Sequence, residues 1–109
     1  MINGLKKDIT SSHTISLNEL YEILQLDVMV GILVDKMGIS TDKVIVANSW
    51  DELGFDDLDG IEFIMAIEKI YNCYIDDISA NQILEISPKR LCQILLINKR
   101  DQNIEQIIQ

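Results

Sequence analysis

Apolar side chains recur at intervals of three and four residues along most of the chain, the spacing that places them on one face of an α-helix. The first series follows Ser16-Leu-Asn-Glu19, which matches a capping box with Ser16 as N-cap and Glu19 reaching back. The pattern predicts one long helix, kinked near Asp27 or Gly31 and ending at Gly38. Its apolar positions are Leu17, Leu20, Tyr21, Leu24, Val28 and Ile32.

Residues 39–56 predict a long connection between this helix and the next one. Its apolar residues are expected to pack onto the helices: Val44, Ile45, Val46 and Trp50. A short strand over 44–46 is one interpretation, although no partner strand is visible. Ser49-Trp-Asp-Glu52 matches a second capping box and predicts a single helical turn.

A second helix is expected to start at Asp57, with this aspartate as a good N-cap, and to fade near Asn72. Its apolar side comprises Leu58, Ile61, Ile64, Met65 and Ile67, and its polar side Asp59, Glu62, Glu68 and Lys69. A third capping box, Ser79 to Gln82, predicts a short helix over roughly 80–85. Ser87-Pro88 predicts the start of a last helix carrying Leu91, Ile94 and Leu95, with serine as N-cap and proline at the first helical position.

These elements predict an all-α fold. We expect a small bundle of three main helices plus one short helix, with a long loop between the first and second helices. One proline and no run of alternating apolar and polar residues argue against a β fold. Residues 1–15 are interpreted as a flexible N-terminal extension, residues 16–98 as the helical domain and residues 99–109 as a helix extension or tail.

The chain of 109 residues fits one domain, and its 48% hydrophobic content is enough for a packed core. Its formal net charge of −9 repels nucleic acid phosphates and anionic membranes and attracts basic protein surfaces. The composition therefore favours basic protein partners and argues against nucleic acid. The longest apolar run, residues 28–34, is too short to span a bilayer, so no membrane insertion is expected.

The two cysteines, Cys73 and Cys92, form no CxxC pair, and His13 is the one histidine of the sequence. A zinc or iron-sulfur site would have almost no ligands, so we expect no metal. Free buried thiols in a reducing cytoplasm are the plainer interpretation. The N-terminus has no apolar h-region and predicts no signal peptide, which also favours a cytoplasmic protein.

The stretch 51–62 contains six acidic residues and no basic one. A calcium loop with Gly60 at its centre would need ligands at Phe55 and Ala66, which have none to offer. Carboxylate catalysis lacks a neighbouring histidine or lysine, so no catalytic residue is expected. The plainest interpretation is a helix start whose acids complement the helix dipole.

The same stretch carries a resemblance to a known family. Leu53-Gly-Phe-Asp-Asp-Leu-Asp59, followed by Glu62-Phe-Ile-Met-Ala-Ile-Glu68, resembles the prosthetic-group region of acyl carrier proteins, which reads Leu-Gly-x-Asp-Ser-Leu-Asp. Tyr71 stands where an aromatic is usual, and Ile75-Asp-Asp77 resembles the following Ile-Pro-Asp. The resemblance covers roughly residues 23–98 and implies a carrier of fatty acid, polyketide or peptide synthesis.

Asp57 stands where the family carries the serine that holds its phosphopantetheine arm. A carboxylate does not form that phosphodiester, so no cofactor is expected on this chain. A serine at position 57 would imply phosphopantetheine. Two explanations remain open: a natural, degenerate carrier that kept the docking surface, or a functional carrier altered from serine to aspartate by engineering.

The resemblance also implies a docking surface for basic partner enzymes or regulatory proteins on the second helix. Its residues would be Asp56, Asp59, Glu62, Met65 and Glu68. An acyl chain is a further candidate ligand, in a space within the bundle lined by Ile61, Phe63, Ile64, Ile67, Ile94 and Leu95. An ordinary filled core is the simpler interpretation of that interior, because close packing is the default.

Overall fold

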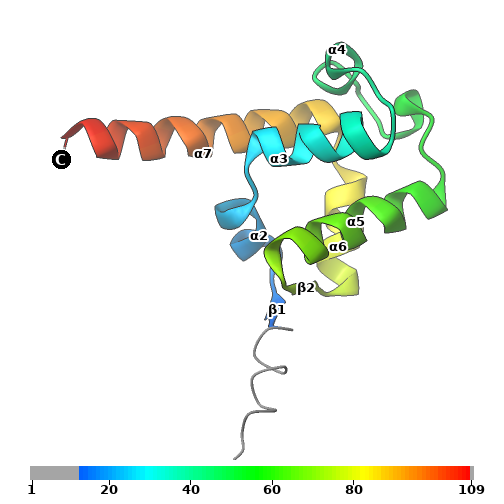
Figure 1. Cartoon of the computed structure of the whole chain (residues 1–109), viewed down its shortest axis with the longest axis horizontal. Coiled ribbons are helices and arrows are strands. Elements are labelled where there is room, and N and C mark those ends of the chain that lie inside the picture. The colour runs from blue at the N-terminus through cyan, green and yellow to red at the C-terminus, as the bar shows by residue number, and fades with distance from the viewer. Residues whose placement is uncertain (1–12, 109) are drawn as a thin grey trace, which may run out of the picture.

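A computed structural model describes residues 13–108 of the chain, with side chains described for residues 13–98. The structure is an all-α bundle, as the sequence predicts (Figure 1). Helix α7 lies beside α3 and α2, and α2 also contacts α6. Residues 1–12 of the expected N-terminal extension lie outside the described part. The expected extension over 99–109 belongs to α7 (Pro88–Ile108) as far as Ile108.

The expected single first helix is wrong, because the chain forms three consecutive pieces. These are α2 (Leu17–Ile23), α3 (Leu26–Gly31) and a π-helix, η1 (Ile32–Lys36). Leu24 and Gln25 adopt extended backbone, so the break precedes the predicted kink at Asp27. The buried Leu24 side chain and a hydrogen bond from the Gln25 N–H to the Tyr71 hydroxyl (3.1 Å) hold this break.

The predicted start and end of the first helical region, at Ser16 and Gly38, are confirmed. The Ser16 N–H donates to the Glu19 carboxylate (2.9 Å), and the Glu19 N–H donates to the Ser16 hydroxyl (3.3 Å). The first of these bonds favours the charged carboxylate and lowers the pKa of Glu19. Gly38 has φ +72°, and its N–H donates to the Val34 carbonyl, so it ends the helical region as predicted.

The long connection contains a short helix, α4 (Thr41–Val44), and a 3-10 turn, η2 (Asp51–Leu53). The suggested strand over 44–46 is therefore wrong. Val44 and Trp50 are buried as expected, whereas Ile45 and Val46 are exposed. The predicted helical turn is confirmed by η2, but its capping box is only half formed. The Glu52 N–H donates to the Ser49 hydroxyl at 3.3 Å, whereas the Glu52 carboxylate accepts from the Asn48 N–H at 2.8 Å.

The second main helix, α5 (Asp57–Tyr71), starts where the sequence predicts, but its N-cap is Asp56 and not Asp57. The Asp59 N–H donates to the Asp56 carboxylate (2.9 Å), and the Asp56 N–H donates to the Asp59 carboxylate (3.1 Å). These two bonds form a capping box, and they place the N-cap one residue earlier than expected. The helix ends at Asn72, whose backbone is left-handed with φ 52°.

The short helix α6 (Asp77–Glu85) is longer than predicted, and its N-cap is Asp76 and not Ser79. The Ser79 N–H donates to the Asp76 carboxylate at 2.8 Å, so the serine lies within the first turn. The start of α7 is confirmed, since the Arg90 N–H donates to the Ser87 hydroxyl at 3.0 Å.

A two-residue parallel ladder was not expected. Strand β1 (Thr14–Ile15) pairs with β2 (Tyr74–Ile75), which connects α5 to α6. The Tyr74 N–H also donates to the His13 carbonyl (2.8 Å). Ile15 is buried, so residues 14–15 belong to the folded domain and not to a loose extension.

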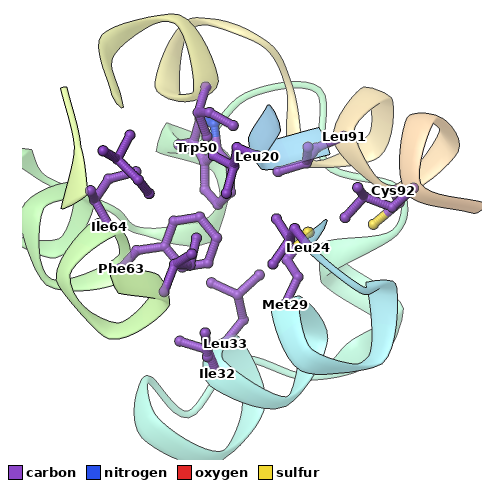
Figure 2. Packing of buried hydrophobic residues seen from close by; sticks show 14 of the residues in the cluster. Leu20, Leu24, Met29, Ile32, Leu33, Trp50, Phe63, Ile64, Leu91 and Cys92 are labelled. Carbon is purple, nitrogen blue, oxygen red and sulfur yellow. The ribbon is translucent and has the colours of Figure 1, made fainter. Parts of the chain in front are cut away.

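The core gathers apolar side chains from nearly every element (Figure 2). Phe63, Ile64, Ile67 and Leu95 are buried as predicted. Three residues assigned to the apolar side of α5 do not pack into the core, because Leu58, Ile61 and Met65 are exposed. Each lies on the side of α5 opposite the buried Phe63 or Ile67, so none of them can reach the interior. Ile94 is only half-buried. Ile61 and Ile94 therefore do not lie fully inside the bundle, where the space for an acyl chain is expected.

Candidate docking face around helix α5

The start of α5 is held by a tight turn and an aromatic anchor. Gly54 adopts a left-handed backbone (φ +82°), and its N–H donates to the Asp51 carbonyl at 2.9 Å. Phe55 is buried against Trp50, with ring centroids 5.0 Å apart. Glycine takes this backbone conformation without the steric cost that a side chain brings. The Leu-Gly-Phe part of the motif therefore fixes where α5 begins.

Asp57 is the first residue of α5 and is exposed. The neighbouring Asp56 provides the capping bonds, which leaves the Asp57 carboxylate outside the capping box. Asp57 also lines an open pocket of about 320 Å³ between α5 and α6. The pocket lining comprises Trp50, Asp51, Phe55, Asp56, Asp57, Gly60, Ile61, Asn81 and Leu84.

This pocket is poorly equipped for acid–base or metal chemistry. Its ionisable groups are three carboxylates, from Asp51, Asp56 and Asp57, with no histidine, lysine or cysteine beside them. The lining therefore offers these carboxylates no partner of another chemical type. Among the described residues, no cluster of three or more histidines, cysteines or carboxylates could hold a metal ion.

Three of the predicted docking residues, Glu62, Met65 and Glu68, line one shallow hollow together with Lys36 and Lys69. Asp59 and Glu62 lie on the flank of α5 that faces η1, where they line a hollow of about 280 Å³ together with Lys36. Asp56 lines a pocket on the flank that faces α6, and Glu68 lines another pocket there as well as the hollow shared with Glu62. Met65 is exposed on the ridge between the flanks and contributes to hollows on both sides.

Three of the four predicted acids also hold the fold together. Asp56 and Asp59 form the capping box of α5. The Glu68 carboxylate accepts a hydrogen bond from the Ile75 N–H at 2.8 Å, which fastens β2 to α5. Sequence patterns do not reveal that bond, because it joins a helix to a strand that has no sequence signal of its own.

The sequence interpretation missed the contribution of α6 to this region. Asp77, Ala80, Asn81 and Leu84 face α5 and line a pocket of about 410 Å³. Their spacing of three and four residues places them on one face of α6. This spacing could have indicated the face of α6 that contacts α5. The sequence prediction starts α6 at about residue 80, so it leaves Asp77 out of the helix.

Both cysteines are free. Cys92 is buried in α7, and burial raises the pKa of its thiol. Cys73 is half-buried after α5, where burial, followed by the nearby Glu68 carboxylate, raises the pKa of its thiol. Both thiols are therefore held in the weakly reactive, protonated form at neutral pH.

The fold and the motif define a class, namely a small acidic helical domain of the carrier type whose second main helix starts with the exposed Asp57. The chain is 39% identical over 56 residues to an acyl carrier protein of Rhodopseudomonas palustris, a match that covers 50% of this chain and 71% of the relative. An acyl carrier protein of Afipia carboxidovorans matches with the same identity and the same coverage. The chain therefore belongs to the acyl carrier protein family.

No model of a protein family matches the chain. No solved structure matches it either. In the part of the chain that the structure describes, no helix has the length and apolar character needed to cross a membrane.

Proposed function

We propose that this chain is an acyl-carrier-like binding module that docks basic partner proteins through α5 and carries no phosphopantetheine arm. It acts as a binding protein in the cytoplasm and not as an enzyme. The docking residues are those expected from the motif: Asp56, Asp59, Glu62, Met65 and Glu68. The partners are enzymes or regulatory proteins that present lysines and arginines.

The observation that carries the proposal is Asp57. It occupies the family's serine position, at the exposed first residue of α5 and beside an open pocket. This position is accessible to a modifying enzyme, but a carboxylate cannot form the phosphodiester that a serine hydroxyl forms. The docking helix is thus retained while the attachment chemistry is lost.

The charge distribution supports docking to basic partners. The chain has a net charge of −9, and in α5 the carboxylates of Asp57 and Glu62 are exposed, as is the apolar Met65. Complementary charge raises the association rate and fixes orientation more than it adds affinity. The two free thiols support the cytoplasmic location.

A genuine acyl or peptidyl carrier, with its serine replaced by aspartate, is the second candidate. The relatives named acyl carrier protein favour it. In this alternative the chain belongs to fatty acid, polyketide or peptide synthesis, and only position 57 separates it from a loaded carrier. An acyl chain would then be a ligand, and phosphopantetheine the cofactor.

The first experiment tests the role of position 57. The protein, Asp57→Ser and Asp57→Ala are each incubated with coenzyme A and a promiscuous phosphopantetheinyl transferase, and intact mass is measured. We expect only Asp57→Ser to gain the mass of one arm, because it alone presents a hydroxyl there. Asp57→Ala is the matched control, since it also removes the carboxylate but supplies no nucleophile.

The other outcomes count against the proposal. An arm on the unaltered protein would show that another residue is modified, and the armless module would be wrong. If Asp57→Ser folds but stays unmodified, the transferase does not recognise the α5 surface, and carrier-like docking is contradicted. Circular dichroism of each variant establishes that the bundle is intact.

A further inference from the structure

Helix α7 has two sides of different character. Its inner side packs into the bundle through four buried residues, Pro88, Leu91, Cys92 and Leu95. Their spacing of three and four residues places them on one face of the helix. Figure 1 shows α7 along one edge of the bundle, where it contacts α2 and α3. The opposite side of α7 therefore faces away from the bundle.

Two large apolar side chains lie next to each other on this outer side. Leu96 is 47% exposed and Ile97 is 52% exposed. Directly after them, the Asn98 side-chain amide donates to the Tyr21 carbonyl at 2.9 Å, which fastens α7 to α2 at this level. The exposed pair is thus held on an anchored helix. Adjacent apolar side chains that stay exposed indicate an interaction site more often than scattered single residues do.

The outer side of α7 also carries positive charge, although the chain as a whole is acidic. Lys89 and Arg90 are exposed in the first turn of the helix. No acidic residue lies between Pro88 and Asn98, in a chain that has 18 acidic and 9 basic residues. Within residues 13–98, neither of the two cations forms an ion pair. Their charge is therefore not compensated by a close partner in this part of the fold.

Helical spacing joins the charged pair and the apolar pair into one surface. Gln93 lies three or four residues from each member of both pairs, so it shares a side of the helix with all of them. The outer face of α7 comprises Lys89, Arg90, Gln93, Leu96 and Ile97, and all five are exposed. It follows the helix for roughly 12 Å, with cations at one end and apolar side chains at the other.

The two cations occupy the end of α7 where they stabilise the helix least. The first turn is the positive end of the helix dipole and favours carboxylates. The other α-helices of the described chain each carry an aspartate or glutamate in the first turn, whereas α7 has none. Residues that break a local rule in this way are expected where a function requires them. The charge of Lys89 and Arg90 thus fits a ligand better than it fits the helix.

We propose that the outer face of α7 binds an acidic, amphipathic helix of a partner protein. Apolar side chains of that helix cover Leu96 and Ile97, and aspartates or glutamates near one of its ends pair with Lys89 and Arg90. This partner is opposite in charge to the partners proposed for α5, and it binds a different helix. The inference goes beyond the proposed function and does not depend on it.

The charges of the molecule select this occupant. An amphipathic helix recognises apolar side chains at three- and four-residue spacing, and its carboxylates fix its orientation on the two cations. A single helix covers only the outer face, within the short range over which exposed charges act in salt. A second copy or an anionic membrane would also bring negative charge opposite the acidic remainder of the chain, whose net charge is −9.

The probe for this inference is a fluorescein-labelled synthetic peptide of leucine, alanine and glutamate, about four turns long, with its leucines on one helical face. Fluorescence anisotropy measures its affinity for the full chain and for variants. We expect Ile97→Ser to weaken binding about tenfold, because the central apolar contact is lost. Arg90→Gln is expected to weaken it about threefold and to reduce its dependence on salt.

Each variant has a matched control outside the outer face. Ile78→Ser makes the same change at another isoleucine, which is 72% exposed in α6. Lys43→Gln removes an exposed positive charge from α4. We expect both controls to change the affinity by less than about twofold. Thermal melts of all four variants establish that the bundle is intact.

A second peptide tests the role of the apolar face. It has the same composition with its leucines scrambled, and it should bind at least about tenfold more weakly, since it cannot present leucines on one side.

Three results would overturn the inference. These are no binding of the patterned peptide, equal binding of the scrambled one, or an effect of Ile97→Ser no larger than that of Ile78→Ser. Self-association of the chain, or its binding to phosphatidylglycerol vesicles, would also overturn it if Ile97→Ser abolished that property, because the face would then belong to a second copy or to lipid. The transferase experiment at position 57 reports on α5, so a failure there and a failure at α7 are distinguishable.

Discussion

Two neighbouring aspartates at the start of α5 have different roles. Asp56 exchanges hydrogen bonds with Asp59 and caps the helix, whereas Asp57 is exposed at the first helical position. An N-cap side chain satisfies a backbone N–H that the helix leaves unpaired. Asp57 interacts with the helix only through the weaker dipole effect. The capping of α5 therefore depends on Asp56 and Asp59 and not on Asp57.

Removing each aspartate separates these roles. We expect Asp56→Ala to lower the free energy of unfolding by about 1 kcal/mol, because the cap is lost. Asp57→Ala should lower it by only about 0.3 kcal/mol. Urea unfolding followed by circular dichroism measures both. Equal losses for the two variants would contradict the assignment of Asp56 as the cap.

At the scale of elements, one distant residue stabilises the break between α2 and α3. The Gln25 N–H, left without a helical partner by the break, donates to the hydroxyl of Tyr71 at the end of α5. The Tyr71 ring packs against the core while its hydroxyl reaches the break. The end of one helix thus fixes where another is interrupted.

Tyr71→Phe keeps the ring and removes that acceptor. We expect a loss of about 0.5–1 kcal/mol in unfolding free energy, because water replaces part of the bond at this exposed site. Amide hydrogen exchange of Gln25 should accelerate, since its protecting bond is gone. Tyr74→Phe, on the exposed side of β2, is the control and should leave that exchange rate unchanged. Unaltered exchange at Gln25 in Tyr71→Phe would refute the role of the hydroxyl.

At the scale of the whole molecule, an aromatic cluster joins the long connection to the bundle. Trp50 packs against Phe55 and Phe63, with ring centroids 5.0 and 5.2 Å away. The Trp50 indole N–H donates to the Ile86 carbonyl at 2.7 Å, between α6 and α7. One side chain thereby ties the connection to α5 and to the junction of the last two helices.

Phe63→Ala should therefore destabilise the bundle strongly. Phe63 is fully buried (0% exposed), and its removal leaves a cavity that costs about 3–5 kcal/mol. Leu58→Ala is the matched control on the same helix. Leu58 is 61% exposed, and we expect a loss below about 0.5 kcal/mol. Chemical denaturation monitored by Trp50 fluorescence compares the two, and similar losses would contradict the described packing.

Local signals in the sequence determined several helix ends, the family and the acidic character of α5. The capping box at Ser16, the stop at Gly38 and the Ser87-Pro88 start depend on bonds between residues close in the chain, and all three were predictable. The family followed from the motif around Asp57, because short spacings alone define it. The acidic character of α5 was likewise readable from composition and helical spacing.

Only the tertiary structure decided which apolar residues are buried and which acids share a surface. Leu58 and Ile61 fit a helical pattern, yet they face outward, because burial depends on which side of α5 the other helices cover. Ile15 carries no helical signal but is buried through pairing of β1 with β2. The close packing of Leu84 against Gly60 of α5 is likewise a contact between residues that no local spacing connects.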